Sequence, residues 1–145
     1  MSISSYRFLL VTDSPDDYGH QALREAVSAL GSCQVIPEAE VVSLLREQVF
    51  DVVIVDAGSV TSAPELVSWI RASDFSVQVV VVTLSPHWKI ARAVFRAGAV
   101  DYLPKSLSKT EILATFQSIL ERRATSVRLD AHGGMRNDTG NDSVR

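Results

Sequence analysis

The chain has 145 residues, a hydrophobic fraction of 46% and a formal net charge of −3. This length fits one domain, and the hydrophobic fraction is high enough for a continuous core without disulfide or metal support. The single cysteine, Cys33, excludes an intramolecular disulfide framework and a cysteine-rich zinc site. The slightly acidic charge balance gives no electrostatic footprint for nucleic acid, so we expect no direct binding of nucleic acid.

The amino-terminal segment MSISSYRFLLVTD contains an apolar run that Asp13 ends after a few residues. A run of this length is too short for the hydrophobic region of a signal peptide or for a membrane span. We therefore expect a cytoplasmic protein that does not associate with a membrane.

Three short apolar runs predict strands that are buried on both faces. They are rich in bulky and β-branched residues, they do not alternate with polar residues, and polar or turn residues follow each of them. This pattern is typical of a parallel sheet covered by helices on both sides. Weaker patterns predict two further strands. The runs lie at residues 8–11, 52–55 and 77–82, and the weaker strands lie at 33–36 and 100–103.

Five stretches with the apolar spacing of amphipathic helices alternate with these strands. Gly31 stands at the end of the first stretch and Gly98 at the end of the fourth, as expected of helix terminators. The last stretch opens at Ser108 with Glu111 three residues later, which is a capping-box pattern. The alternation predicts a doubly wound α/β domain, with a five-stranded parallel sheet and helices on both faces.

The composition changes near Arg122, where the chain becomes poor in apolar residues and rich in Gly, Asn, Asp and Ser. Such a segment buries too little surface to offset the entropy lost on ordering. We therefore expect one domain over residues 1–122 and a disordered tail or linker stub over residues 123–145.

Polar residues follow four of the predicted strands. Asp13 follows the first strand, Asp56 the third, Thr83 the fourth and Lys105 the fifth. Each residue taken alone is better explained as an ordinary turn or helix-cap residue. Ligands of open α/β sheets bind beyond the carboxyl ends of the strands, however, so the joint placement indicates a site at that edge, centred on Asp56.

At these strand ends the chain resembles the receiver domain of two-component response regulators. The resemblance covers roughly residues 6–122, and its motifs are LLVTDSP, DVVIVDAGSV, VVVVTLS and GAVDYLPKS. The last motif is the most specific, because the family commonly has Gly-Ala-x-Asp-Tyr-Leu-x-Lys there. The resemblance implies a flavodoxin-like receiver fold and a regulatory domain rather than a metabolic enzyme, with at most self-phosphorylation and self-dephosphorylation.

The resemblance also implies roles for individual residues. Asp56 would be the phosphoacceptor for a histidine kinase or phosphotransfer protein. Asp13 and the backbone carbonyl of Gly58 would join Asp56 in holding Mg²⁺, a cation that prefers oxygen ligands. Lys105 would contact the phosphoryl oxygens, and Thr83 would donate a hydrogen bond to them after transfer.

A partner surface is implied as well. After transfer, Thr83 would shift toward the phosphoryl group, and the rotamer of Tyr102 would follow that shift. The fourth helix would present the surface to a downstream partner protein or to a second copy of the chain. The residues expected on that surface are Trp88, Lys89, Arg92 and Arg96.

Four departures from the family pattern concern the reactive edge. Thr12 replaces the first of two adjacent acids, which should weaken Mg²⁺ affinity because the site has fewer carboxylates. Leu84 stands where a small residue usually follows the threonine, and its side chain could restrict access to the acceptor. Ser106 stands where many members have proline after the lysine, and residues 58–61 lack the usual sequence after the acceptor.

Three functions stay open from the sequence. A working receiver with altered kinetics is favoured because its main site residues are present. A phosphorylation-independent pseudo-receiver, acting as a protein-interaction platform, is the first alternative. A small flavodoxin-like nucleotide-binding protein is the second, and the lack of both glycine-rich phosphate motifs argues against it. The three histidines, His20, His87 and His132, show no metal-ligand spacing and are given no catalytic role.

Overall fold

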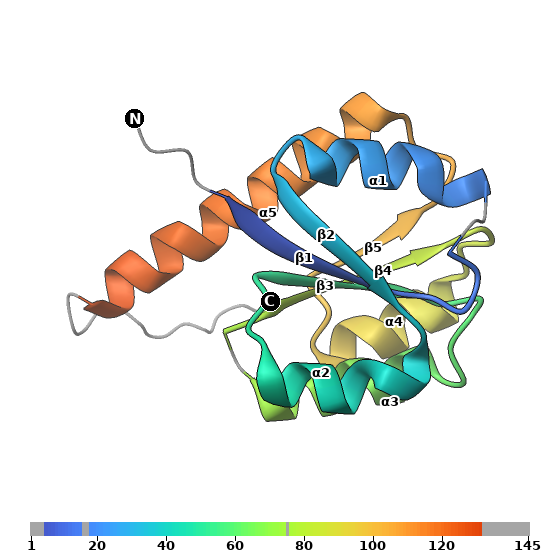
Figure 1. Cartoon of the computed structure of the whole chain (residues 1–145), viewed down its shortest axis with the longest axis horizontal. Helices are drawn as coiled ribbons and strands as arrows, with labels where there is room; N and C mark the ends of the chain where they lie inside the picture. Colours follow the sequence, from blue (N-terminus) through green and yellow to red (C-terminus); the bar gives the residue numbers. More distant parts are fainter. Residues whose placement is uncertain (1–4, 16–17, 75, 132–145) are drawn as a thin grey trace. The chain divides into compact units, whose positions relative to one another are not determined.

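Five strands form one parallel sheet in the computed structural model, which describes residues 5–15, 18–74 and 76–131. The strand order is β2-β1-β3-β4-β5, and all four neighbouring pairs are parallel (Figure 1). The order reverses between β1 and β3, which is the position where sheets of this kind bind ligands. The strands are β1 (Tyr6–Val11), β2 (Gly31–Ile36), β3 (Val52–Asp56), β4 (Gln78–Thr83) and β5 (Asp101–Pro104).

Helices alternate with the strands along the described part of the chain, which confirms the predicted doubly wound α/β fold. Two short 3-10 helices precede the first two α-helices. The α-helices are α1 (Gln21–Ser28), α2 (Val41–Glu47), α3 (Ala63–Ser73), α4 (Trp88–Ala97) and α5 (Lys109–Ala131). The 3-10 helices are η1 (Tyr18–His20) and η2 (Glu38–Glu40).

The sheet is buried from both sides. Helices α2, α3 and α4 cover one face, where Val41, Val67 and Val94 join alternate strand residues such as Val53 in one apolar cluster. Helix α1 lies on the opposite face (Figure 1). Every residue of β3 is buried, which explains why its sequence shows no alternation of polar and apolar residues.

The ends of two helices match their sequence signals. Gly98 follows α4 in the left-handed region at φ 118°, and its N–H donates to the carbonyls of Val94 and Phe95 at 3.1 Å each. At the start of α5 the Ser108 N–H donates to Glu111 Oε1 at 2.9 Å, and the Glu111 N–H donates to Ser108 Oγ at 3.1 Å. The predicted capping box is therefore present.

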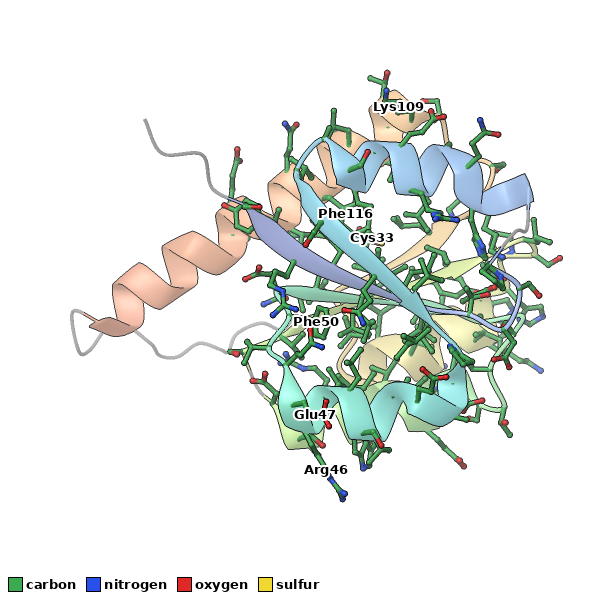
Figure 2. The ribbon with its side chains drawn as sticks, in the orientation of Figure 1. Cys33, Arg46, Glu47, Phe50, Lys109 and Phe116 are labelled. Carbon is green, nitrogen blue, oxygen red and sulfur yellow. The ribbon has the colours of Figure 1, made fainter. Side chains whose placement is uncertain are left out.

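Helix α2 shows how the apolar spacing orients an element. Val41 is buried against the sheet, whereas Arg46 and Glu47 are exposed, and both extend away from the strands (Figure 2). The charged residues therefore cover the solvent side of α2, as its sequence pattern indicates.

The chain divides into two compact units, Met1–Leu113 and Ala114–Arg145. The first unit holds the sheet, helices α1 to α4 and the start of α5. In the second unit the structure describes the rest of α5, which continues to Ala131. The predicted domain boundary at residue 122 stays a prediction, and the part of the expected tail at 132–145 lies outside the described residues. Among the described residues, the helices contain no segment with the length and hydropathy needed to cross a membrane.

Candidate functional site

The carboxyl edge of the sheet brings together residues from four strand ends. Asp56 is the last residue of β3 and Thr83 is the last residue of β4, while Thr12 directly follows β1 and Lys105 directly follows β5. Thr12, Asp56 and Thr83 are buried, with 1%, 2% and 7% of their surfaces exposed. The parallel sheet therefore produces the edge site that the sequence predicts, and Asp56 lies at its centre.

The first carboxylate oxygen of Asp56 contacts the fifth strand end and the loop after β3. Lys105 Nζ lies 2.9 Å from Asp56 Oδ1, and the side chain of Lys105 is 4% exposed. The Gly58 N–H donates to the same oxygen at 3.2 Å. A buried carboxylate needs partners of this kind, and the ion pair and the amide supply them to Asp56.

The second carboxylate oxygen of Asp56 contacts two groups from the opposite side. The Thr12 hydroxyl donates to Asp56 Oδ2 at 2.8 Å, and the same hydroxyl oxygen accepts the Ser14 N–H at 3.0 Å. The Ser14 contact explains the direction of the Thr12 bond, because the amide donates to the hydroxyl oxygen and leaves the hydroxyl proton for Asp56. The other group is His20, whose Nε2 lies 3.2 Å from Oδ2.

His20 is a site residue that the sequence does not reveal. It ends η1 and is fully buried. The one signal in the sequence is its helical spacing with Leu23 and Val27, which are also buried, and that spacing predicts burial rather than a contact with Asp56. The contact depends on how the loop after β1 is folded, and no motif encodes that geometry.

Asp13 adopts a different orientation from the one implied by the family resemblance. Its side chain is exposed, and its Oδ1 accepts the N–H of Glu38, the first residue of η2, at 3.3 Å. Its backbone N–H donates to Ser59 Oγ. Asp13 is therefore held toward η2 and the loop after β3.

The residues implied for Mg²⁺ do not fit the ion in this arrangement. Both oxygens of Asp56 accept contacts from protein donors, and an oxygen of Asp13 is bonded to the Glu38 amide. Among the described residues, no group of three His, Cys, Asp or Glu side chains is placed to hold a metal ion. Mg²⁺ prefers octahedral oxygen ligands at about 2.0–2.1 Å. The donor set around Asp56 is instead one of hydrogen-bond donors.

Thr83 and Tyr102 lie on the other side of Asp56, toward α4. The Thr83 hydroxyl oxygen accepts the Ser85 N–H at 3.1 Å, and the Thr83 carbonyl accepts the Lys105 N–H at 2.7 Å. The Tyr102 hydroxyl accepts the His87 N–H at 3.2 Å. Both residues line a surface pocket of about 430 Å³ that also includes Gly58. The structure thus brings Thr83 and Tyr102 into one hollow beside the loop after β3.

Helix α4 presents the residues that the resemblance implies for a partner surface. Trp88 is 64% exposed, with Lys89 Nζ 5.8 Å from the centre of its ring. Arg92 and Arg96 are also exposed. Phe95, which the sequence analysis does not select, is 47% exposed and lies about two helical turns after Trp88. The two aromatic side chains and the basic residues give this helix a mixed apolar and cationic exposed surface.

Comparisons with known proteins agree with the fold. Solved structures that resemble the chain include the BeF3-activated receiver domain of DrrB from Thermotoga maritima, at 24% identity and TM-score 0.70, covering 81% of this chain and 99% of that one. A CheY-like receiver domain protein from Methanospirillum hungatei JF-1 shares 17% identity at TM-score 0.73, with coverages of 85% and 99%. A LuxR-family two-component response regulator from Aurantimonas sp. SI85-9A1 shares 26% identity at TM-score 0.69, with coverages of 83% and 88%.

The sequence itself gives the family. No curated protein matches the chain. A family model described as the response regulator receiver domain matches residues 16–117, which is more than half of the chain. Together with the parallel sheet and the Asp56–Lys105 pair at its carboxyl edge, this match shows that the chain belongs to the response regulator receiver domain family.

Proposed function

We propose that the chain is a receiver switch of a two-component system, working in the cytoplasm, in which Asp56 accepts a phosphoryl group. The observation that carries the proposal is the 2.9 Å contact between Lys105 Nζ and Asp56 Oδ1 at the switch point of the sheet. Receiver domains are signal transducers rather than metabolic enzymes. The phosphoryl donor would be a histidine kinase, a phosphotransfer protein or a small phosphodonor.

Phosphoryl transfer to Asp56 would require few covalent steps from the protein. An oxygen of Asp56 attacks phosphorus, the bond from phosphorus to the donor breaks, and an aspartyl phosphate forms. Lys105 offsets the charge of the phosphoryl oxygens, and Thr83 donates its hydroxyl to one of them after transfer. These roles match the requirement of phosphoryl transfer for positioning and charge compensation. Mg²⁺ has no part in these steps, because the residues around Asp56 do not fit it.

The partner surface proposed for the switch is the exposed side of α4. Trp88 is a suitable anchor because large aromatic side chains contribute much of the energy at protein interfaces. The basic side chains Lys89, Arg92 and Arg96 favour an acidic partner surface. Tyr102 connects this region to the site, because its hydroxyl accepts the N–H of His87, the residue before α4.

Phosphoryl acceptance can be tested directly on the purified chain. We expect incubation with acetyl phosphate, with or without Mg²⁺, to add one phosphoryl group, seen by intact-mass spectrometry, with Asp56 identified after borohydride reduction and peptide mapping. Asp56→Asn should show no adduct. Asp13→Asn is the matched control for removing a carboxylate at the same edge without removing the acceptor. A wild-type chain that stays unmodified under these conditions contradicts the proposal, and an adduct on Asp56→Asn shows that another residue is the acceptor.

A second function is favoured by one specific observation. Asp56 is 2% exposed, and both of its carboxylate oxygens are engaged by protein groups. This enclosure suits a phosphorylation-independent platform, in which the carboxylate stabilises the edge of the sheet and α4 binds its partner constitutively. The same experiment separates the two functions, because a platform yields no adduct. In a platform, the wild-type chain and the Asp56→Asn variant would also bind the partner with equal affinity.

A further inference from the structure

Two side chains contact Asp56 Oδ2, the oxygen that a bound cation would have to coordinate. Thr12 Oγ1 lies at 2.8 Å and His20 Nε2 at 3.2 Å. We propose that His20 is a specificity-determining residue that, with Thr12, excludes divalent cations from Asp56. The inference rests on the proposed function only in sharing its site, and it concerns what the site binds before any phosphoryl group arrives.

The position of the His20 ring supports exclusion. Its Nε2 lies 3.2 Å from Asp56 Oδ2, and the side chains of His20 and Asp56 are 1% and 2% exposed. The imidazole therefore occupies space beside the oxygen that a cation would coordinate. Because Asp56 and His20 are both almost fully buried, a cation cannot reach Oδ2 without moving the imidazole.

The local charge supports exclusion as well. Lys105 lies 2.9 Å from Asp56 Oδ1 and already offsets the negative charge of the carboxylate. Thr12 contributes a neutral hydroxyl, and Asp13 is bonded to the Glu38 amide on η2. Affinity for a hard divalent cation falls as the number of available carboxylates falls. Asp56, a single carboxylate already paired with Lys105, is therefore a poor ligand for a divalent cation.

A purely structural role for His20 predicts a different outcome. Burial alone would need only a side chain of suitable volume, and Leu23 and Val27 on the same side of this segment show that apolar residues are accommodated there. The position of Nε2 next to Asp56 Oδ2 is the feature that volume does not explain. Substitution by leucine should then retain the packing and remove one of the two groups that contact this oxygen, leaving the Thr12 hydroxyl.

The experiment measures cation binding rather than phosphorylation. Mn²⁺ serves as a paramagnetic probe that broadens nearby amide signals in ¹H–¹⁵N spectra, and Mg²⁺ is added to compete with it. The amides of Gly58 and Ser59 report on the site, because the Gly58 N–H donates to Asp56 Oδ1 and the Ser59 N–H donates to the Asp56 carbonyl. The variants are His20→Leu and Thr12→Asp/His20→Leu. His87→Ala is the matched control, because His87 is an exposed histidine at the start of α4.

In wild type and His87→Ala we expect no saturable broadening at these amides with millimolar Mn²⁺. His20→Leu should bind measurably. The double variant should bind at least roughly tenfold more tightly than His20→Leu, because it adds a carboxylate beside Asp56. Saturable broadening of Gly58 and Ser59 in the wild type, reversed by Mg²⁺, overturns the proposal without any variant. Folded variants that bind no better than the wild type overturn it too. A wild-type chain that accepts no phosphoryl group leaves this result unaffected, so the two proposals fail separately.

Discussion

Asp56 shows how a single buried charge is stabilised by a few specific partners. Transfer of a carboxylate into the core is costly unless it is paired and hydrogen-bonded. Lys105, Thr12 and the Gly58 amide supply these contacts, and His20 adds a fourth within 3.2 Å. These groups come from three strand ends and from η1, so the carboxylate also links segments that are distant in sequence.

Cys33 provides a pH-dependent prediction at the residue scale. It lies on β2, an edge strand of the sheet, and is half-buried (Figure 2). Burial raises the pKa of the Cys33 thiol, and the neighbouring charge of Arg24 lowers it by less. We expect Ellman's reagent to react several-fold more slowly with the folded chain than with the urea-unfolded chain at mildly alkaline pH, because less thiolate is present.

The same shift gives the sign of a stability effect. The folded state binds the thiol proton more tightly than the unfolded state, so its contribution to stability is complete below the ordinary pKa of a thiol. That contribution is lost as pH rises through the raised pKa. Cys33→Ser is the control, because it should remove this part of the alkaline dependence. Equal labelling rates for the folded and unfolded chains, over the alkaline range, would contradict the shift.

At the scale of elements, the sequence predicts the strands and helices well wherever burial dictates the pattern. The runs at 52–55 and 77–82 match β3 and β4 within one residue, because burial on both faces selects apolar residues at successive positions. The predicted strand at 33–36 begins two residues late. β2 already pairs with β1 from Gly31, where a side chain would collide with the backbone oxygen of Tyr6.

Loop geometry is the part of the site that local pattern does not predict. Asp13 is turned toward η2 by the amide of Glu38, 25 residues away in sequence. His20 reaches Asp56 through the path of the loop after β1. Both orientations depend on long-range contacts. Residue types and their spacing therefore predict the edge site, but they do not predict that Asp13 is turned toward η2 or that His20 lies next to Asp56.

Gly98 offers a test of helix termination. It has φ 118°, and a Cβ there would lie 2.8 Å from Arg71 Cγ on α3. We expect Gly98→Ala to lower the free energy of unfolding by about 1–3 kcal/mol, because a side chain is strained in this conformation. Urea denaturation followed by circular dichroism measures the loss. Gly58→Ala is the matched control, since its backbone is not left-handed and the nearest neighbour of a Cβ lies at 3.8 Å. Equal losses for both variants would show that the conformation of Gly98 is not the cause.

At the scale of the whole sheet, the strand order determines which residues can meet. With β3 between β1 and β4, the ends of β1, β3 and β4 are neighbours, and β5 completes the edge. The sequence predicts this convergence because parallel strands place their carboxyl ends on one side. The stability of the sheet and the chemistry of its edge therefore depend on the same carboxylate.

This dependence predicts a large cost for removing Asp56. We expect Asp56→Ala to lower the free energy of unfolding by about 3–5 kcal/mol, because breaking a buried ion pair leaves its groups in the core without the carboxylate. Asp56→Asn should cost less, since an amide oxygen still accepts the Thr12 hydroxyl. Urea denaturation measures both losses. Asp13→Ala is the control, and it should change stability by no more than about 1 kcal/mol because Asp13 is exposed. Similar losses at Asp13 and Asp56 would show that the enclosure of Asp56 does not form in solution, and a stabilised Asp56→Ala would mean that the carboxylate is poorly compensated by Lys105 and its neighbours.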